Sequence, residues 1–302
     1  MDSIKIAIIE ARPHLSKQSV ATYSSILKNL YLKVFSDDKI DIKKFNNSEK
    51  ILHFLKTLEP NKRKTVLSAL VILTDNKDFR TQMLDDINTY NKEQGKQTMN
   101  SSQSESWVDV EEINQLLNRL EKNARLIYKK EVPTSSDLQQ VQNYIIMCLL
   151  GGVFIPPRRS KDFVDFKIKN INKDSDNYLI KNKMIFNSYK TAKTYGQQEI
   201  IVPAELLRIL KKWTKFNPTE HLLFDSNGSK LTNVKLNQRL NKLFGKKASV
   251  NQLRHTYLSD KYQDTIKLNQ DMADDMAAMG SSTAQEKIYI KQTKPKTKSA
   301  EI

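Results

Sequence analysis

Hydrophobic residues in the first 90 positions recur at the three- and four-residue spacing of amphipathic α-helices. From Val20 to Val34 they form one stripe, and Ser16 stands where an N-terminal helix cap is expected. Similar stripes recur further on, over residues 51–58, 66–73 and 79–90. The pattern predicts a bundle of about four helices over residues 1–90.

Beyond residue 106 helical and strand-like periods alternate. Residues 110–120 and 138–150 have helical spacing, and the second run ends at Gly151-Gly152. Four short segments then alternate apolar and polar residues, as half-buried strands do: Phe166/Ile168, Tyr178/Ile180, Met184/Phe186 and Ile200/Val202. Helical spacing resumes over residues 204–216, 234–244, 250–262 and 268–279. We therefore expect a mainly α protein whose second domain is α+β, with a small antiparallel sheet.

A polar segment separates the two halves of the chain. Residues 91–106 (NKEQGKQTMNSSQSES) contain only Met99 as a large apolar residue, as expected of a solvated linker. The sequence thus predicts a helical domain over 1–90, a linker over 91–106 and a second domain over 107–292. Residues 293–302 are rich in lysine and are expected to form a mobile basic tail.

Composition narrows the choice of partners and chemistry. Among 302 residues, Lys and Arg number 50 and Asp and Glu 34, which gives a net charge of +16 and favours a polyanion, nucleic acid first. No apolar run reaches the roughly 18 residues of a membrane span, so no membrane partner is expected. The single cysteine, Cys148, excludes an internal disulfide and fits a reducing, intracellular compartment. The four histidines have no i, i+4 pair, so no metal site is expected.

Four features in the second domain carry candidate chemistry. In chain order they are residues 157–162 (PRRSKD), 189–196 (YKTAKTYG), 251–256 (NQLRHT) and 288–290 (IYI). Together they supply two arginines that can grip phosphate oxygens, a hairpin lysine that can protonate a leaving oxygen and a tyrosine that can attack phosphorus. Taken singly, each residue also has an ordinary interpretation as a surface cation or a packed tyrosine. The combination is the set needed to break a phosphodiester without metal.

The resemblance that favours the chemical interpretation begins at NQLRHT, which is similar to the His-x-Leu-Arg-His-Thr box of tyrosine recombinases, the phage-integrase family. Residues 159–162 (RSKD) resemble the family's Arg-x-x-Glu box. Residues 279–282 (MGSS), followed by Ile288-Tyr289, resemble Leu-Gly-His-Ser-Ser and the nucleophilic tyrosine. The resemblance covers about residues 107–292, and the helical segment before it suits the family's core-binding domain, which completes a clamp around DNA. The Pro-Pro-Arg-Arg string and the Lys, Asn and Ile bias resemble versions from virophages and large DNA viruses.

The resemblance implies roles for the catalytic residues. Arg159 and Arg254 correspond to the two phosphate-gripping arginines, and Tyr289 corresponds to the nucleophile. Lys190 corresponds to the hairpin general acid, with Lys193 as the alternative, because the length of such hairpins varies.

The remaining candidates keep two interpretations each. Asn251 replaces the usual first histidine of its box and can hydrogen-bond a phosphoryl oxygen, but it is a poor proton shuttle. His255 matches the histidine after the second arginine, although a core histidine that orients the helix is the favoured interpretation. The histidine usual between Gly280 and Ser281 is missing; Ser281 either replaces it as a hydrogen-bond donor or caps a helix. Arg158 is expected to contact the DNA backbone or solvent.

A basic cluster in the helical domain is a further candidate for DNA contact. Lys62, Arg63 and Lys64 are consecutive and are expected to stand between helices, where their charges can meet the phosphate backbone.

The function implied by the resemblance is site-specific cleavage and rejoining of double-stranded DNA through a 3′-phosphotyrosyl link. No cofactor is needed, because the protein link conserves the bond energy, and assembly as a homo-tetramer on two DNA sites is implied. Two alternatives stay open: a catalytically silent DNA-binding protein of the same fold, favoured by the absent histidines, and a monomeric type IB topoisomerase-like enzyme. Action in the nucleus and action in a cytoplasmic viral factory both fit the sequence.

The net charge generates a first prediction. Affinity for duplex DNA should fall steeply with salt, because lysines and arginines that neutralise phosphates release the counterions held there. In a plot of log affinity against log salt concentration, each neutralised phosphate contributes a slope of about −0.9. Fluorescence titrations at increasing salt measure this slope, and a flat line would argue against DNA as the partner.

Overall fold

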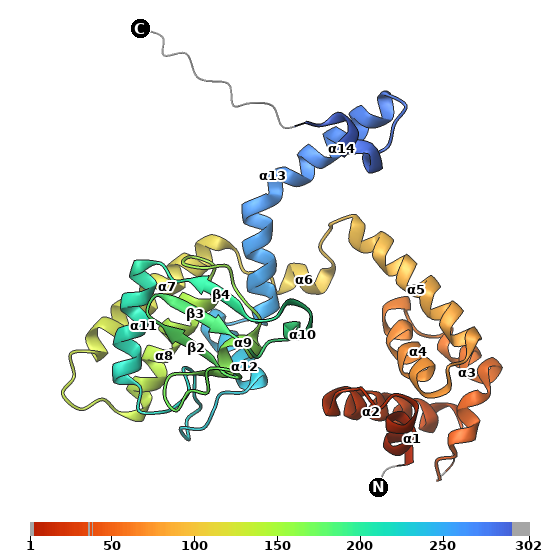
Figure 1. Ribbon diagram of the computed structural model, residues 1–302, viewed down its shortest axis with the longest axis horizontal. Coiled ribbons are helices and arrows are strands. Elements are labelled where there is room, and N and C mark those ends of the chain that lie inside the picture. Colours follow the sequence, from red (N-terminus) through yellow and green to blue (C-terminus); the bar gives the residue numbers. More distant parts are fainter. Residues whose placement is uncertain (1–2, 36, 38, 292–302) are drawn as a thin grey trace. The chain divides into compact units, whose positions relative to one another are not determined.

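The computed structural model describes residues 3–35, 37 and 39–291, and the chain divides into two compact units, Met1–Met99 and Asn100–Ile302 (Figure 1). The division falls within residues 91–106, the segment predicted as a linker. Most of that segment is helical, and none of its side chains is buried. The basic tail predicted over residues 293–302 lies outside the described residues.

The first unit is a helical bundle, as its hydrophobic pattern predicts. Its elements are α1 (Ser3–Ala11), α2 (Lys17–Val34), the 3₁₀ helix η1 (Ile42–Asn46), α3 (Ser48–Leu55), α4 (Pro60–Thr74) and α5 (Lys77–Gly95). Ser16 caps α2 as expected, with its hydroxyl oxygen accepting the amide of Ser19 at 3.1 Å. Helix α1 is not in the prediction; Ile4 and Ile8, fully buried, hold this short helix against α2 and α4.

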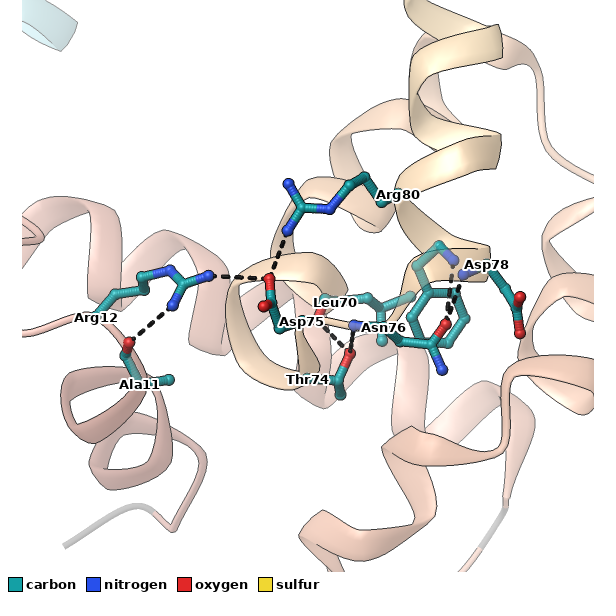
Figure 2. A network of polar contacts seen from close by, with 9 residues as sticks. Ala11, Arg12, Leu70, Thr74, Asp75, Asn76, Asp78 and Arg80 are labelled. Carbon is teal, nitrogen blue, oxygen red and sulfur yellow. Dashed lines mark hydrogen bonds and ion pairs between the residues drawn. The ribbon is translucent and has the colours of Figure 1, made fainter.

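The turn between α4 and α5 is organised by polar contacts (Figure 2). Asp75 adopts a left-handed backbone conformation with φ of 52° at the end of α4, and its carboxylate accepts bonds from Arg12 and Arg80. Asn76 then caps α5 by accepting the amide of Asp78 at 2.8 Å. Because these ion pairs are solvent-exposed, they set the geometry of the turn more than its stability.

The second unit is mainly helical with a four-stranded sheet, which confirms the predicted fold class. Its elements are α6 (Ser101–Glu105), α7 (Val110–Ile127), α8 (Ser135–Leu150), α9 (Ser160–Val164), β1 (Phe166–Lys167), β2 (Asn177–Ile180), β3 (Lys183–Phe186), α10 (Ala192–Tyr195), β4 (Gln198–Ile201), α11 (Ala204–Phe216), α12 (Asn233–Phe244), α13 (Val250–Ala278), the 3₁₀ helix η2 (Thr283–Gln285) and α14 (Glu286–Tyr289). Helix α8 lies at the centre of the core, with Tyr144 through Leu150 all buried.

The sheet differs from the prediction in one pairing. Strands β2, β3 and β4 are antiparallel as expected, but β1 pairs with β2 in parallel, so the sheet is mixed. A period-two pattern reports which side chains face the core and carries no information on strand direction, and β1 has only two residues.

Helix α13 replaces two predicted helices. Residues 250–262 and 268–279 were expected to be separate, yet Val250–Ala278 is continuous, because the intervening residues 263–267 contain neither glycine nor proline. Its first two turns are packed into the unit: Leu253 is buried, and Thr256 donates to the carbonyl of Val108. From there the helix extends away from the sheet, as Figure 1 shows, and most of its side chains are exposed.

The start of α8 generates a prediction about pH. Asp137 accepts bonds from Lys130 at 2.6 Å and from the amide and hydroxyl of Thr134 at 2.9 and 2.8 Å. These bonds, with Lys130 the largest cause, lower the pKa of Asp137 to about 2. The pKa of an unfolded aspartate is about 3.9. The contribution of Asp137 to the free energy of unfolding is therefore complete above that pH and is lost as pH falls towards 2.

Asp137→Asn should therefore lower the melting temperature at neutral pH and flatten its decline between about pH 4 and 2. Thermal melts over this range measure both effects. Asp271→Asn, at an exposed position of α13, is the matched control. An unchanged pH profile in Asp137→Asn would contradict the role of the ion pair.

Candidate active site

A cavity of about 270 Å³ lies in the second unit where α9, the β3–β4 hairpin and the start of α13 meet. It is lined by Pro156, Pro157, Arg158, Arg159, Asp162, Tyr189, Thr191, Tyr195, Gln198, Ile200 and Arg254. The structure thus brings Arg159 and Arg254 to one site, although they are far apart in the sequence.

Arg158 is held by protein groups on several sides. Its Nε donates to Asp162 Oδ2 at 2.8 Å and its Nη1 to Gln198 Oε1 at 3.0 Å, and the guanidinium carbon lies 4.0 Å from the centroid of the Phe186 ring. The side chains of Arg158 and Asp162 are only 16% and 3% exposed. Arg158 is thus not the solvated side chain that the sequence allowed, and its contact with the DNA backbone stays a prediction. Arg158 joins α9 to β3 and β4.

The guanidinium of Arg159 is free. Among the described residues its side chain makes no hydrogen bond or ion pair, although the residue is only half exposed. Its backbone is extended, with φ of −67° and ψ of 151°, immediately before α9.

Arg254 is nearly as free. Its side chain has one long contact, from Nη1 to Asn251 Oδ1 at 3.4 Å. Burial lowers the pKa of Arg254, and the charge of Arg159 lowers it further, whereas Asp162 opposes the shift. The two arginines therefore repel each other in a partly desolvated site.

Among the described residues, Asp162 supplies the one carboxylate that lines the cavity. Burial raises its pKa, and the neighbouring Arg158, Arg159 and Arg254 oppose that rise. Its Oδ1 atom is buried without a hydrogen-bond partner among the described residues. Three guanidiniums against one carboxylate leave the cavity positive, which suits an anion such as a phosphate group.

The β3–β4 hairpin is fixed at both its base and its tip. At the base, Asn177 donates to the Ser188 carbonyl at 2.8 Å and accepts the amides of Asn187 and Ser188 at 2.9 and 2.8 Å. At the tip, Tyr189 donates its hydroxyl to the Gly196 carbonyl at 2.6 Å. Gly196 has φ of 66° and ψ of −157°, a conformation that is essentially restricted to glycine.

The hairpin lysines stand near the cavity without lining it. Lys190 follows the buried Tyr189, Lys193 lies on α10, and both are exposed. Which of the two acts as the acid stays a prediction.

The remaining catalytic candidates lie apart from the cavity or at its edge. Tyr289 is 52% exposed on α14 and does not line the cavity. The rise of α13 between Arg254 and Ala278 is about 36 Å, so the structure does not bring Tyr289 to the arginines. Ser281 follows α13, and its hydroxyl donates to Gln285 at 2.8 Å.

The two polar neighbours of Arg254 on α13 are both at the surface. Asn251 is exposed beside Arg254, as a substrate contact requires. His255 is also exposed, so it is not the core histidine that the sequence favoured. His255 points to a different side of α13 from the buried Leu253 and Thr256, because successive helical residues are rotated by about 100°.

In the first unit, the predicted basic cluster lies within α4 rather than between helices. Arg63 forms a largely buried ion pair with Asp86, and its Nε lies 2.8 Å from Asp86 Oδ2. The Lys64 ammonium lies 3.1 Å from the centroid of the Tyr90 ring. Of the three, Lys62 alone is exposed and has no hydrogen-bond or ion-pair partner in the described part of the chain.

Sequence reasoning did not single out Asp162, Gln198 or Tyr195 as parts of the site. Asp162 and Tyr195 lie within the motifs PRRSKD and YKTAKTYG, in which the arginines and lysines carry the stronger chemical signal. For Gln198 no sequence signal was available, because its role depends on the strand pairing that places it beside Arg158.

Two further properties of the described residues concern metal ions and membranes. They include no group of three or more His, Cys, Asp or Glu side chains that could hold a metal ion. None of the described helices combines the length and apolar character needed to cross a bilayer.

Comparison with known proteins gives structural likenesses only. No family model matches the sequence, and no curated protein matches it. The similar solved structures include XerH site-specific recombinase bound to palindromic difH substrate in a post-cleavage complex, with 16% identity, a TM-score of 0.43 and coverage of 82% of this chain and 69% of that one. Another is a lambda integrase(75-356) dimer bound to a COC′ core site, with 12% identity, a TM-score of 0.44 and 97% coverage of both chains. At TM-scores below 0.5 these likenesses carry no functional argument.

The contrast between adjacent arginines generates a prediction. Arg158→Ala should destabilise the fold by about 3–5 kcal/mol, because it leaves Asp162 buried and unpaired. Arg159→Ala should change stability by less than about 0.5 kcal/mol, because its side chain makes no ion pair or hydrogen bond with the described residues. Urea denaturation measures both, and equal effects would contradict the division between a structural and a free arginine.

Proposed function

We propose that this protein is a DNA strand-cleaving and rejoining enzyme of the tyrosine recombinase type. The observation that supports this function best is the convergence of Arg159 and Arg254 on one positive cavity with their guanidiniums free of ion pairs. Free, partly desolvated guanidiniums bind a phosphate more strongly than solvated ones do.

In the proposed reaction the two arginines bind the non-bridging oxygens of the scissile phosphate and stabilise the extra charge of the pentavalent transition state. The hydroxyl of Tyr289 attacks phosphorus and releases its proton to solvent. The bond from phosphorus to the 5′ oxygen breaks, and Lys190, or Lys193, gives that oxygen a proton. A 3′-phosphotyrosyl link and a free 5′ hydroxyl result. Attack by a 5′ hydroxyl on this link reverses the sequence and restores the duplex, so no cofactor is consumed.

Tyr289 must be delivered to the cavity for this reaction. Two routes exist: α13 bends within the same chain, or a second copy inserts its own α14. The second route agrees with the proposed homo-tetramer on two double-stranded DNA sites, in which neighbouring copies exchange their C-terminal segments.

One alternative function has a structural observation in its favour. Because Tyr289 lies far from the arginines and two usual histidines are absent, the same fold would also suit a DNA-binding protein without catalytic activity. The topoisomerase-like alternative and the resemblance to viral versions stay predictions.

A nicked suicide substrate tests the proposal. Wild-type protein should form a covalent adduct with such DNA, and Tyr289→Phe should bind the DNA equally well without forming it, because only the attacking oxygen is removed. Arg159→Ala and Arg254→Ala should each slow adduct formation by about 10²-fold or more, since each removes charge stabilisation that develops in the transition state. Denaturing gels detect the adduct, and filter binding measures affinity.

A mixture of Tyr289→Phe and Arg254→Ala chains decides the route of delivery. If Tyr289 acts in a neighbouring copy's cavity, the mixture regains adduct, whereas delivery within one chain leaves it inactive. Absence of adduct from wild-type protein on every nicked duplex, with DNA binding intact, would reject the enzyme and favour the silent binding protein.

A further inference from the structure

The cavity is lined by an exposed tyrosine, Tyr195, and not by Tyr289, the tyrosine that the sequence predicted as the nucleophile. Tyr195 lines the cavity together with Arg159 and Arg254, and 67% of it is exposed. In the described part of the chain its hydroxyl makes no hydrogen bond, and its ring contacts no other ring or cation. Tyr189, which lines the same cavity, differs in burial and bonding: it is 6% exposed and its hydroxyl donates to the Gly196 carbonyl. The hairpin therefore carries one structural and one free tyrosine.

The backbone that carries Tyr195 is well fixed. The amide of Tyr195 donates to Thr191 at 3.1 Å, and that of Gly196 donates to Ala192 at 2.8 Å, which closes the single turn of α10. Ala192 packs against the core, and the bond from Tyr189 holds the Gly196 carbonyl. A rigid support thus holds Tyr195 at the cavity, while its side chain makes no hydrogen bond, ring pair or cation–π contact with the described residues.

We propose that Tyr195 forms a nucleoside-binding subsite beside the phosphate site, in which its ring stacks on the base next to the phosphate held by Arg159 and Arg254. Any phosphodiester bound by the arginines has a nucleoside on each side, and an exposed aromatic ring at the rim offers a stacking face for one of them. This inference rests on the proposed function in taking DNA as the ligand of the cavity.

The ring, rather than the hydroxyl, carries the proposed contact. In the proposed reaction Tyr289 attacks and Lys190, or Lys193, protonates the leaving oxygen, so no step is left for the Tyr195 hydroxyl. Stacking needs only an accessible π face.

The form of the DNA follows from the same chemistry. In an intact duplex each base is already stacked on its neighbours, so removing one from the stack costs free energy, and the cost is smallest for a base that is already unpaired. Tyr195 should therefore contribute most when the DNA has a nick or an unpaired base beside the bound phosphate, the state that cleavage itself creates.

A nicked duplex with 2-aminopurine as the base beside the nick is the probe. Wild-type protein should quench the 2-aminopurine fluorescence, Tyr195→Phe should quench it equally, and Tyr195→Ala should lose the quenching. Tyr195→Ala should also weaken binding of the nicked duplex by about 5- to 150-fold, the range expected for loss of one base–aromatic stack, and weaken binding of the intact duplex less. Tyr262→Ala is the matched control, because Tyr262 is an exposed tyrosine on α13 outside the cavity lining.

Two outcomes would overturn the inference. One is Tyr195→Ala behaving as Tyr262→Ala in quenching and affinity. The other is Tyr195→Phe losing the covalent adduct while binding is unchanged, which would assign the chemistry to the hydroxyl. If wild-type protein forms no adduct but still quenches the fluorescence, the proposed enzyme is rejected and the subsite is retained. Loss of quenching with the adduct retained would reject the subsite alone.

Discussion

The buried ion pair between Arg158 and Asp162 is the interaction on which the geometry of the cavity depends. It ties the start of α9 to β4 through Gln198 and packs the guanidinium on the Phe186 ring of β3. A buried pair of this kind adds little net stability relative to a well-packed apolar pair, but removal of one partner is costly. Its value here is positional, because it fixes the backbone that presents the neighbouring Arg159.

The electrostatics of the cavity follow from that arrangement. The charges of three guanidiniums act on Asp162, but only Arg158 forms an ion pair with it. Arg159 and Arg254 therefore keep uncompensated charge. The direction of the pKa shift of Arg254 reflects the same imbalance, since burial and the charge of Arg159 both disfavour its protonated form. A phosphate group would relieve the repulsion between the two arginines and supply the missing counter-charge.

The groups that would act on such a phosphate are unequally placed. Arg159 and Tyr195 are held at the cavity by the short helices α9 and α10, and Arg254 lies in the packed first turns of α13. Tyr289 lies beyond the rest of that long and mostly exposed helix. The cavity is thus complete in the second unit without Tyr289. In the proposed reaction, either α13 would have to bend or a second copy would have to supply its own Tyr289.

The sequence by itself determined the helical bundle, the positions of most helices and the β3–β4 hairpin, because hydrophobic period and turn residues such as Gly196 are local properties. Resemblance also pointed to Arg159 and Arg254. Strand direction in β1, the continuity of α13 and the exposure of His255 were decided only by the tertiary structure. So was the division of roles between Arg158 and Arg159, two chemically identical neighbours in the sequence. Which of them is free depends on where Asp162 and Gln198 lie in space, and no local pattern encodes a contact between α9 and β4.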